Sequence, residues 1–375
     1  MEVEEKCVGD AAVAALPSKV AALNVTGVTS EVSFAHLPAL KRLVCCGTLV
    51  GDAALATLPP CLEVLNMDDC RGVTAAASFA HLPALKKVSC RYTAVGNAAL
   101  STLPPCLEEL DMTGCRITAV ASFAHLPALR RADCGLTAAG DAALATLPPC
   151  LESLGIGGIT AAASFAHLPA LNLVSCSGTA LGDAALATLP PCLEWLYLNR
   201  CRGITAAASF AHLPGLKMVN CSDTAVGDAA LATLPPCLTM LEMGGITAAA
   251  SFAHLRALKT LVCSFTPMGD ATLATLPPCL ETLELDSCRG ITAAASFAHL
   301  RALKSLMCSN TAVGDAALDT LPPRLETLTV LNCTGIMDPI ALVHLPALGN
   351  LHCKGSTLSQ GSIAALESAG VHVYY

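Results

Sequence analysis

Aromatic and charged residues are scarce in this sequence: Phe, Trp and Tyr supply 3% of the 375 residues, and Asp, Glu, Lys and Arg supply 13%. Because 54% of the chain is hydrophobic, its apolar residues are mostly Ala, Leu and Val. This composition favours many thin, similar layers over one deep globular core. The net charge of −8 argues against nucleic acid as a partner, since phosphate contacts need clustered Lys and Arg.

Long apolar runs and targeting signals are also missing. Mean hydropathy is +0.60, yet no stretch offers the roughly 18 uninterrupted apolar residues of a spanning helix. The first residues, MEVEEKCVGD, are acidic, whereas a secretory signal begins basic and then becomes apolar. We therefore expect a cytoplasmic protein without membrane insertion, in which the 21 cysteines are reduced thiols.

A repeated heptapeptide organises the whole chain. FAHLPAL or a close variant starts at residues 34, 79, 123, 165, 210, 252 and 297, and a degenerate copy, LVHLPAL, starts at Leu342. The spacing is 42 to 45 residues, and each unit splits into two halves of 20 to 23 residues, which we call rungs. Both halves open with Leu-x-x-Leu-x-apolar and end in Leu-Pro.

Each rung predicts a short strand, because Leu-x-x-Leu-x-Leu places inward residues at every second position. We expect strands to start near Leu40, Leu62 and their equivalents. The segments GDAALATLP and ITAAASFAHLP offer Asp52 or Thr74 as an N-cap, which predicts a single helical or 3-10 turn.

One rung cannot bury its own apolar face, so the rungs must stack and their strands must form one parallel sheet. We predict a single α/β domain over residues 1–375, an arc-shaped solenoid of about 16 rungs. The parallel sheet is expected on the concave face and the helical turns on the convex face, with partial capping repeats at residues 1–19 and 354–375.

The rung is identified as a leucine-rich repeat. Halves such as LETLELDSCRGIT resemble the cysteine-containing subclass, whose pattern is L-x-x-L-x-L-x-x-C-x-x-I-T. The strict alternation of two rungs with alanine-rich convex segments is similar to the repeat proteins of trypanosomatids. The resemblance covers essentially the whole chain and implies the leucine-rich repeat fold. It also implies two roles known among relatives, regulation of adenylate cyclase and substrate binding within a ubiquitin ligase.

Cysteine and histidine, the residue types that build metal and catalytic sites, recur here in columns. The first-half strand carries Cys45, Cys90, Cys134, Cys176, Cys221, Cys263, Cys308 and Cys353. The second-half turn carries Cys70, Cys115, Cys201, Cys288 and Cys333. The double proline precedes Cys61, Cys106, Cys150, Cys192, Cys237 and Cys279. The heptapeptide supplies His36, His81, His125, His167, His212, His254, His299 and His344.

Members of one column lie on alternate rungs, ~10 Å apart when strands are ~4.8 Å apart. That separation is too long for a disulfide or a shared metal ion, and no C-x-x-C spacing occurs. We expect the cysteines to be small buried hydrophobes, with Cys46 as an exposed thiol, and the histidines to bond nearby backbone on the convex side. The sequence therefore predicts no metal, no cofactor and no catalytic site.

The strand residues whose side chains point away from the core are the ones that differ between rungs, and they are the candidates for a binding site. The second motif position alternates in sign, as in Lys41, Glu63 and Lys86, which favours correct stacking of neighbouring rungs. The third and fifth positions vary more. We interpret the following as a protein-binding site on the concave face: Leu173, Trp195, Tyr197, Met218, Met240, Asn220 and Glu242, with Arg131 and Asp133 among charged early rungs.

The composition and motifs together favour a monomeric, non-enzymatic protein-interaction scaffold of unknown partner. A regulatory adapter of a signalling enzyme, such as an adenylate cyclase, or of a ubiquitin ligase is the alternative.

Overall fold

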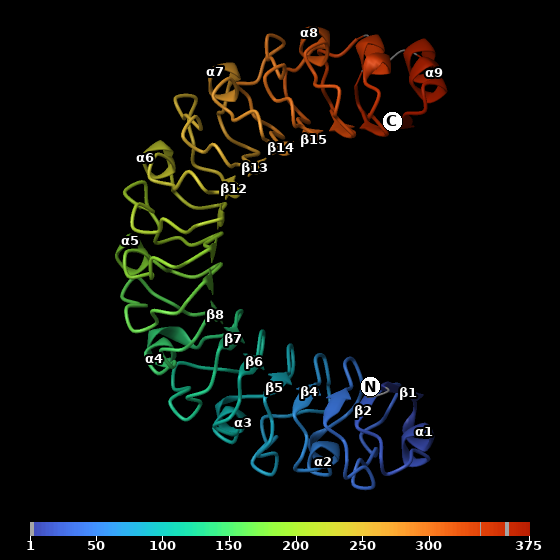
Figure 1. The fold of residues 1–375 in the computed structure, drawn as a ribbon, viewed down its shortest axis with the longest axis vertical. Helices are drawn as coiled ribbons and strands as arrows, with labels where there is room; N and C mark the ends of the chain where they lie inside the picture. The colour runs from blue at the N-terminus through green and yellow to red at the C-terminus, as the bar shows by residue number, and fades with distance from the viewer. Residues whose placement is uncertain (1–3, 338, 357–359) are drawn as a thin grey trace. The chain divides into compact units, whose positions relative to one another are not determined.

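A computed structural model describes residues 4–337, 339–356 and 360–375 of the chain. It contains two compact units, Met1–Leu193 and Glu194–Tyr375, which we call unit 1 and unit 2. In each unit short parallel strands follow one another on one side and short helices lie on the other side (Figure 1).

Unit 1 contains nine strands among its described residues, each paired in parallel with the next strand in the sequence. The strands are β1 Glu4–Val8, β2 Ala22–Thr26, β3 Arg42–Val44, β4 Val64–Asn66, β5 Lys87–Ser89, β6 Glu109–Asp111, β7 Arg131–Cys134, β8 Ser153–Ile156 and β9 Leu173–Ser175. The helices are α1 Asp10–Ala14, α2 Asp52–Leu55, α3 Asn97–Leu100, α4 Gly140–Leu144 and α5 Asp183–Leu186.

Unit 2 repeats this arrangement, and its consecutive strands are again paired in parallel. The strands are β10 Trp195–Tyr197, β11 Met218–Cys221, β12 Met240–Met243, β13 Thr260–Val262, β14 Thr282–Glu284, β15 Ser305–Met307, β16 Thr327–Thr329, β17 Asn350–His352 and β18 His372–Tyr374. The helices are α6 Asp228–Leu231, α7 Asp270–Leu273, α8 Asp315–Leu318, the 3-10 helix η1 Pro339–His344, and α9 Gln360–Ser368.

The core of each unit lies between its strands and its helices, as the leucine pattern predicts. Leu23, Leu43 and Leu65 are in register on β2, β3 and β4 and are at most 1% exposed. Phe34, Leu37 and Cys45 of the first heptapeptide region are fully buried. Stacking of identical inward side chains therefore produces the core, with one layer for each rung.

The strands begin two residues later than the sequence predicts. Leu40 and Leu62 precede the strands because each closes a turn: the Leu40 amide donates to the Leu37 carbonyl, and the Leu62 amide donates to the Pro59 carbonyl, both at 3.1 Å. Strand β1, which pairs with β2, was missed within the predicted N-terminal cap. Residues 1–3 and 357–359 of the two predicted end caps lie outside the described residues.

The first half of each two-rung unit forms a short helix, whereas the second half forms single turns closed by i→i+3 hydrogen bonds, such as that from the Leu82 amide to the Phe79 carbonyl at 2.9 Å, and only the last second half forms a 3-10 helix, η1, among the described residues. Segments such as 74–82 form hydrogen-bonded turns without a helix. Asp52 is also not an N-cap, since Gly51 occupies that position without a side-chain hydrogen bond. The Asp52 carboxylate instead accepts hydrogen bonds from the amide and hydroxyl of Thr74 on the following rung, at 2.9 and 2.5 Å.

The histidine column bonds to the backbone of the preceding rung, in agreement with the predicted contacts to nearby backbone. His36 Nε2 lies 3.0 Å from the Val13 carbonyl oxygen, and His81 Nε2 lies 3.1 Å from that of Leu55. His125, His167 and His254 make equivalent contacts, whereas His299 Nε2 is buried without a hydrogen bond. Burial lowers the pKa of His299, which favours its neutral form.

The second motif position forms the expected ion pairs. Glu63 lies 3.7 Å from the Lys41 ammonium and 3.3 Å from that of Lys86. Glu281 lies between Lys259 and Lys304 at 3.2 and 2.7 Å in the same manner. These pairs join side chains of neighbouring rungs. Within the described residues, no helix is long and apolar enough to cross a bilayer.

Candidate functional site

The sheet face of unit 2 carries a row of large apolar side chains, which we call the Trp–Met row. Trp195, Met218 and Met240 are in register on strands β10, β11 and β12. Their inward neighbours are the core residues Leu196, Val219 and Leu241, so the alternation of the strands directs the row outward. The three residues therefore lie in one line on consecutive strands, as their shared motif position predicts.

Exposure differs along the Trp–Met row. Met240 is 36% exposed and Trp195 is half-buried, but Met218 is only 9% exposed. The strand position of Met218 faces outward, but its side chain is almost fully covered, so Met218 itself offers little surface to a partner. The Lys217 ammonium lies 5.5 Å from the Trp195 ring centroid, within the range of a cation–π contact.

A polar row runs beside the apolar one, two residues further along the same strands. Tyr197, Asn220 and Glu242 are in register there. The Glu242 carboxylate accepts hydrogen bonds from Asn220 Nδ2 at 2.7 Å and from Ser222 Oγ at 2.8 Å. The row is therefore ordered by its own hydrogen bonds.

Four carboxylates gather around a hollow of about 510 Å³ on unit 2. Asp223, Glu242, Glu284 and Asp286 line it together with Phe265, which is 81% exposed. Burial, followed by the charges of Asp286 and Glu242, raises the pKa of Glu284. Arg200 pairs with Asp223 at 3.3 Å, so part of this charge is already neutralised.

Leu173, Arg131 and Asp133, the other predicted site residues, belong to unit 1. Arg131 and Asp133 both line a hollow of about 470 Å³ on the sheet face. Glu109 lies between Lys87 and Arg131, with Nζ–Oε1 and Nη1–Oε1 distances of 2.9 and 3.4 Å. Leu173 is half-buried at an outward position of β9.

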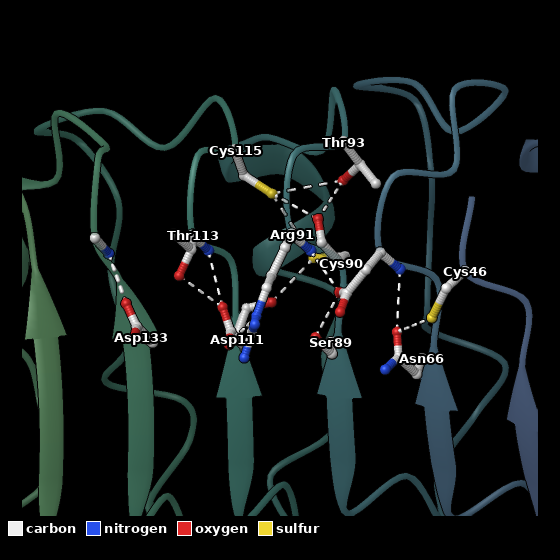
Figure 2. Close-up of polar contacts among 12 residues, drawn as sticks. Cys46, Asn66, Ser89, Cys90, Arg91, Thr93, Asp111, Thr113, Cys115 and Asp133 are labelled. Carbon is white, nitrogen blue, oxygen red and sulfur yellow. Dashed lines mark hydrogen bonds and ion pairs between the residues drawn. The ribbon is translucent and has the colours of Figure 1, made fainter. Parts of the chain in front are cut away.

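The hollow of unit 1 continues past the ends of its strands in a polar network (Figure 2). Asp111 accepts from Arg91 Nε at 2.6 Å and from the Thr113 hydroxyl at 2.8 Å. Asp68 accepts from Ser89 Oγ at 2.5 Å and from the Arg91 amide at 2.9 Å. The charges in this hollow are thus largely paired with one another.

Asp133, like Asp111, is held by the backbone amide two residues further along the chain. It accepts a hydrogen bond from the Gly135 amide at 2.8 Å, and its carboxylate lies over Gly155, where a Cβ would come within 2.5 Å of Oδ1. Glycine at position 155 thus makes room for this carboxylate.

Sequence reasoning missed Asp68, Arg91 and Asp286, which line these hollows two residues beyond the strands. The signal was present, because each of them lies six residues after the first leucine of its rung. The predicted site was drawn only from the third and fifth motif positions and therefore did not include these three residues.

One of the three cysteine columns differs from the prediction, while Cys46 is exposed as expected. The strand and turn columns are buried, but Cys106, Cys192 and Cys237 of the proline column are exposed, as is Cys46. Each proline-column thiol donates to the preceding rung, as Cys61 does to the Pro38 carbonyl at 3.1 Å. Among the described residues, no group of three or more His, Cys, Asp or Glu side chains has an arrangement that could hold a metal ion.

Several solved structures have a backbone fold similar to that of this chain. The chain is similar to a leucine-rich repeat protein of Leptospira interrogans, with a TM-score of 0.61 and 15% identity over 96% of this chain and 90% of that one. It is similar to an internalin of Listeria monocytogenes, with a TM-score of 0.54 and 18% identity over 90% and 87% of the two chains.

TLR13, in a complex with ssRNA13, is similar at a TM-score of 0.58 and 15% identity, over 96% of this chain and 63% of that one. No protein-family model and no curated protein matches the sequence. At these identities the similarity concerns the course of the backbone and does not extend to the residues of the sheet face.

Proposed function

We propose that this chain, which has the leucine-rich repeat fold, is a non-enzymatic protein-binding module whose partner contacts the sheet face. The fold leaves one face of each parallel sheet open, and the strands hold the outward side chains at fixed spacing. The binding surface can therefore be rigid before the partner arrives, which lowers the entropic cost of association.

The observation that carries the proposal is the Trp–Met row of unit 2. An outward tryptophan in register with two methionines is unusual in a chain with one tryptophan and nine methionines. Tryptophan and tyrosine are over-represented at binding hot spots, and methionine is enriched in interface cores. We expect Met218 to form the floor, with Trp195 and Met240 as the exposed anchors.

Asn220, Glu242 and Tyr197 support the proposal as a polar border. Their groups lie directly beside the apolar row, which matches the usual arrangement of an apolar centre with a polar rim. In unit 1 the paired charges around Glu109 and Asp111, with Arg131 and Asp133, would orient a partner more than they would add affinity.

An adapter for an adenylate cyclase or a ubiquitin ligase is a narrower version of the same proposal, since it needs the same sheet-face contact and an enzyme as the partner. The ssRNA of the TLR13 complex has no counterpart in our proposal, because the net charge of −8 repels phosphate.

Site-specific photo-crosslinking tests the proposal. A photoreactive phenylalanine analogue at position 240 faces outward from the sheet, and the same analogue at Ala249, an exposed residue in a turn opposite the strands, is the matched control. We expect a partner from native-cell lysate to crosslink at position 240 and not at position 249. Trp195→Ala should reduce that crosslink at least tenfold, whereas Thr327→Ala, on the same face at β16, should not.

Equal crosslinking at both positions, or a crosslink at position 240 that survives Trp195→Ala, would place the partner elsewhere. Circular dichroism of each variant provides the check on folding.

A further inference from the structure

A smaller hollow of unit 1 lies among the turns that follow strands β4, β5 and β6. Its volume is about 280 Å³, and its lining includes Tyr92, Gly114 and two exposed arginines, Arg71 and Arg116. Among the described residues, no Asp or Glu lines it, whereas the two larger hollows described above are lined by several. The charges at this hollow are therefore all positive.

The floor of this hollow is fixed by hydrogen bonds between rungs and within one turn. The buried Cys70 thiol donates to the Cys45 carbonyl oxygen at 2.9 Å, and the two sulfur atoms are 3.9 Å apart. The Thr93 hydroxyl donates to the Cys90 carbonyl oxygen at 2.7 Å. Because these contacts belong to the core of the rungs, the hollow keeps its shape without a ligand.

Tyr92 occupies a backbone position that suits a smaller residue. Its φ of 54° is left-handed, and the equivalent residues of other first-half rungs are Gly47, Gly178 and Asn310, which adopt this conformation readily. The Tyr92 side chain is nevertheless 57% exposed. Neither the strain nor the exposure favours folding, so a binding role accounts for a tyrosine here better than packing does.

The following rung holds the Tyr92 ring beside the hollow. A Cβ at Gly114 would come within 2.6 Å of Tyr92 Cδ1 and 2.9 Å of Cε1, so the ring lies directly against the Gly114 backbone. The Tyr92 amide donates to the Thr113 carbonyl at 2.9 Å. The ring is thus positioned in advance, while more than half of the side chain remains open to a ligand.

The two arginines of the hollow are free to bind an anion. Among the described residues, neither Arg71 nor Arg116 forms an ion pair, whereas Arg91 pairs with Asp111 at 2.6 Å. The Arg116 backbone pairs with Gly96, and the next residue, Asn97, is neutral where the equivalent residues of other rungs are aspartates. The chain therefore lacks at this rung a carboxylate that it carries elsewhere.

The combination of an exposed ring with arginines on both sides occurs once in the sequence. Leu136 and Phe265 are also left-handed and exposed, but each has a turn arginine on one adjacent rung only, Arg116 for Leu136 and Arg289 for Phe265. Tyr92 has one on both adjacent rungs. The arginines that follow a turn cysteine in second-half rungs are Arg71, Arg116, Arg202 and Arg289.

We propose that this hollow binds an acidic segment of a protein partner, with a carboxylate between Arg71 and Arg116 and an apolar neighbour of that residue on the Tyr92 ring. Guanidinium groups match carboxylates in charge and planar geometry, and an aromatic ring adds apolar contact area. A peptide segment supplies both an anionic and an apolar group, whereas the net charge of −8 opposes a polyanion such as nucleic acid. None of these residues belongs to the Trp–Met row, so the site does not depend on the proposed sheet-face contact.

Fluorescence anisotropy of a fluorescein-labelled peptide, GELELELG, with the folded full-length chain tests the proposal. We expect binding with a Kd below about 1 mM at low ionic strength, which weakens as salt screens the charges. The matched neutral peptide, GQLQLQLG, should bind at least about tenfold more weakly, because it keeps the apolar groups and lacks the carboxylates.

Variants of equal charge separate this hollow from the rest of the surface. Arg71→Gln combined with Arg116→Gln should weaken binding of GELELELG at least about fivefold. Arg202→Gln combined with Arg289→Gln removes the same charge from the equivalent positions of unit 2 and should leave the Kd unchanged. All four side chains are exposed, so each double variant should keep the wild-type circular dichroism spectrum.

Tyr92→Gly tests the ring without loss of the fold. Glycine adopts the left-handed φ without strain, so the thermal midpoint should not fall, while peptide binding should weaken at least about threefold. Phe265→Gly is the matched control, since it removes an exposed left-handed ring of unit 2 and should leave binding unchanged. A destabilised Tyr92→Gly variant with wild-type binding would assign the ring to packing and overturn the proposal.

Three other results would also overturn it: no binding of GELELELG, equal binding of GQLQLQLG, or wild-type binding by the Arg71→Gln and Arg116→Gln variant. A labelled oligouridylate that binds this hollow in place of the acidic peptide would assign it to nucleic acid instead. Trp195→Ala, which tests the sheet-face contact, should leave peptide binding unchanged, so the two proposals succeed or fail separately.

Discussion

The Asp52 carboxylate bridges α2 to the next rung by binding both the amide and the hydroxyl of Thr74. The same bridge joins Asp228 to Thr247 and Asp270 to Thr292. A helix of four residues supplies little stability of its own. We infer that the helices persist because their first residue is attached to a neighbouring rung.

Asp52→Ala should lower the free energy of unfolding by about 1–2 kcal/mol, because it leaves the Thr74 amide and hydroxyl without their charged acceptor. Asp52→Asn should cost less, since Asn97 makes the equivalent bridge to Thr118 with Nδ2–Oγ1 and N–Oδ1 distances of 2.7 and 3.1 Å. Urea denaturation measures both. Asp319→Ala, an exposed aspartate at the end of α8, is the control and should stay within ~0.5 kcal/mol of the wild type.

The buried phenylalanine column should dominate the stability of each layer. Phe252→Ala should cost ~3–5 kcal/mol, because the ring is fully buried and its removal leaves a cavity. Phe252→Leu should cost less than about 1.5 kcal/mol, since much of the volume is kept. Phe265 provides a control of the same residue type, since its ring is 81% exposed and its truncation should hardly alter the denaturation midpoint.

The layers of the fold were predictable because they depend only on the regular spacing of the inward residues along the sequence. Leu43, Phe34 and Cys45 recur at fixed intervals, and a side chain at a repeated inward position has to be buried when rungs stack. The outward direction of Trp195 and Met240 followed from the same alternation. The limited exposure of Met218 did not, because it depends on how neighbouring side chains lie over it.

Contacts that run obliquely between rungs were not predictable from columns. Strand spacing gives the distance from Cys45 to Cys90 but says nothing about Cys70, whose position depends on how the turn after β4 bends back toward the preceding rung. The bridge from Asp52 to Thr74 was missed for the same reason. The single-domain prediction for residues 1–375 stays a prediction, and one coincident unfolding transition in both units would support it.

Glu281, between Lys259 and Lys304, tests the contribution of the register pairs. Hydrogen bonds from Lys304 and then Lys259 lower the pKa of Glu281, so its stabilising effect is present above the unfolded pKa of about 4.3 and is lost as pH falls through the lower folded value. Glu281→Gln should reduce the thermal midpoint slightly at pH 7 and not at pH 3. The difference at pH 7 should shrink in 1 M salt, which screens exposed charges. Glu31→Gln, at an exposed turn, should show neither dependence.

The buried thiols should make the fold sensitive to alkali. Burial, and secondarily the Glu242 carboxylate, raises the pKa of Cys221 to about 12, whereas a thiol in the unfolded chain ionises near pH 8.5. Between these values the unfolded chain loses a proton that the folded chain keeps, so the free energy of unfolding should fall by up to ~1.4 kcal/mol per pH unit for this residue. Cys221→Ala should remove that part of the slope in urea titrations between pH 9 and 10.5, while Ala208→Gly, another buried small residue, should keep it. A wild-type slope in Cys221→Ala would mean that the thiol ionises equally in both states.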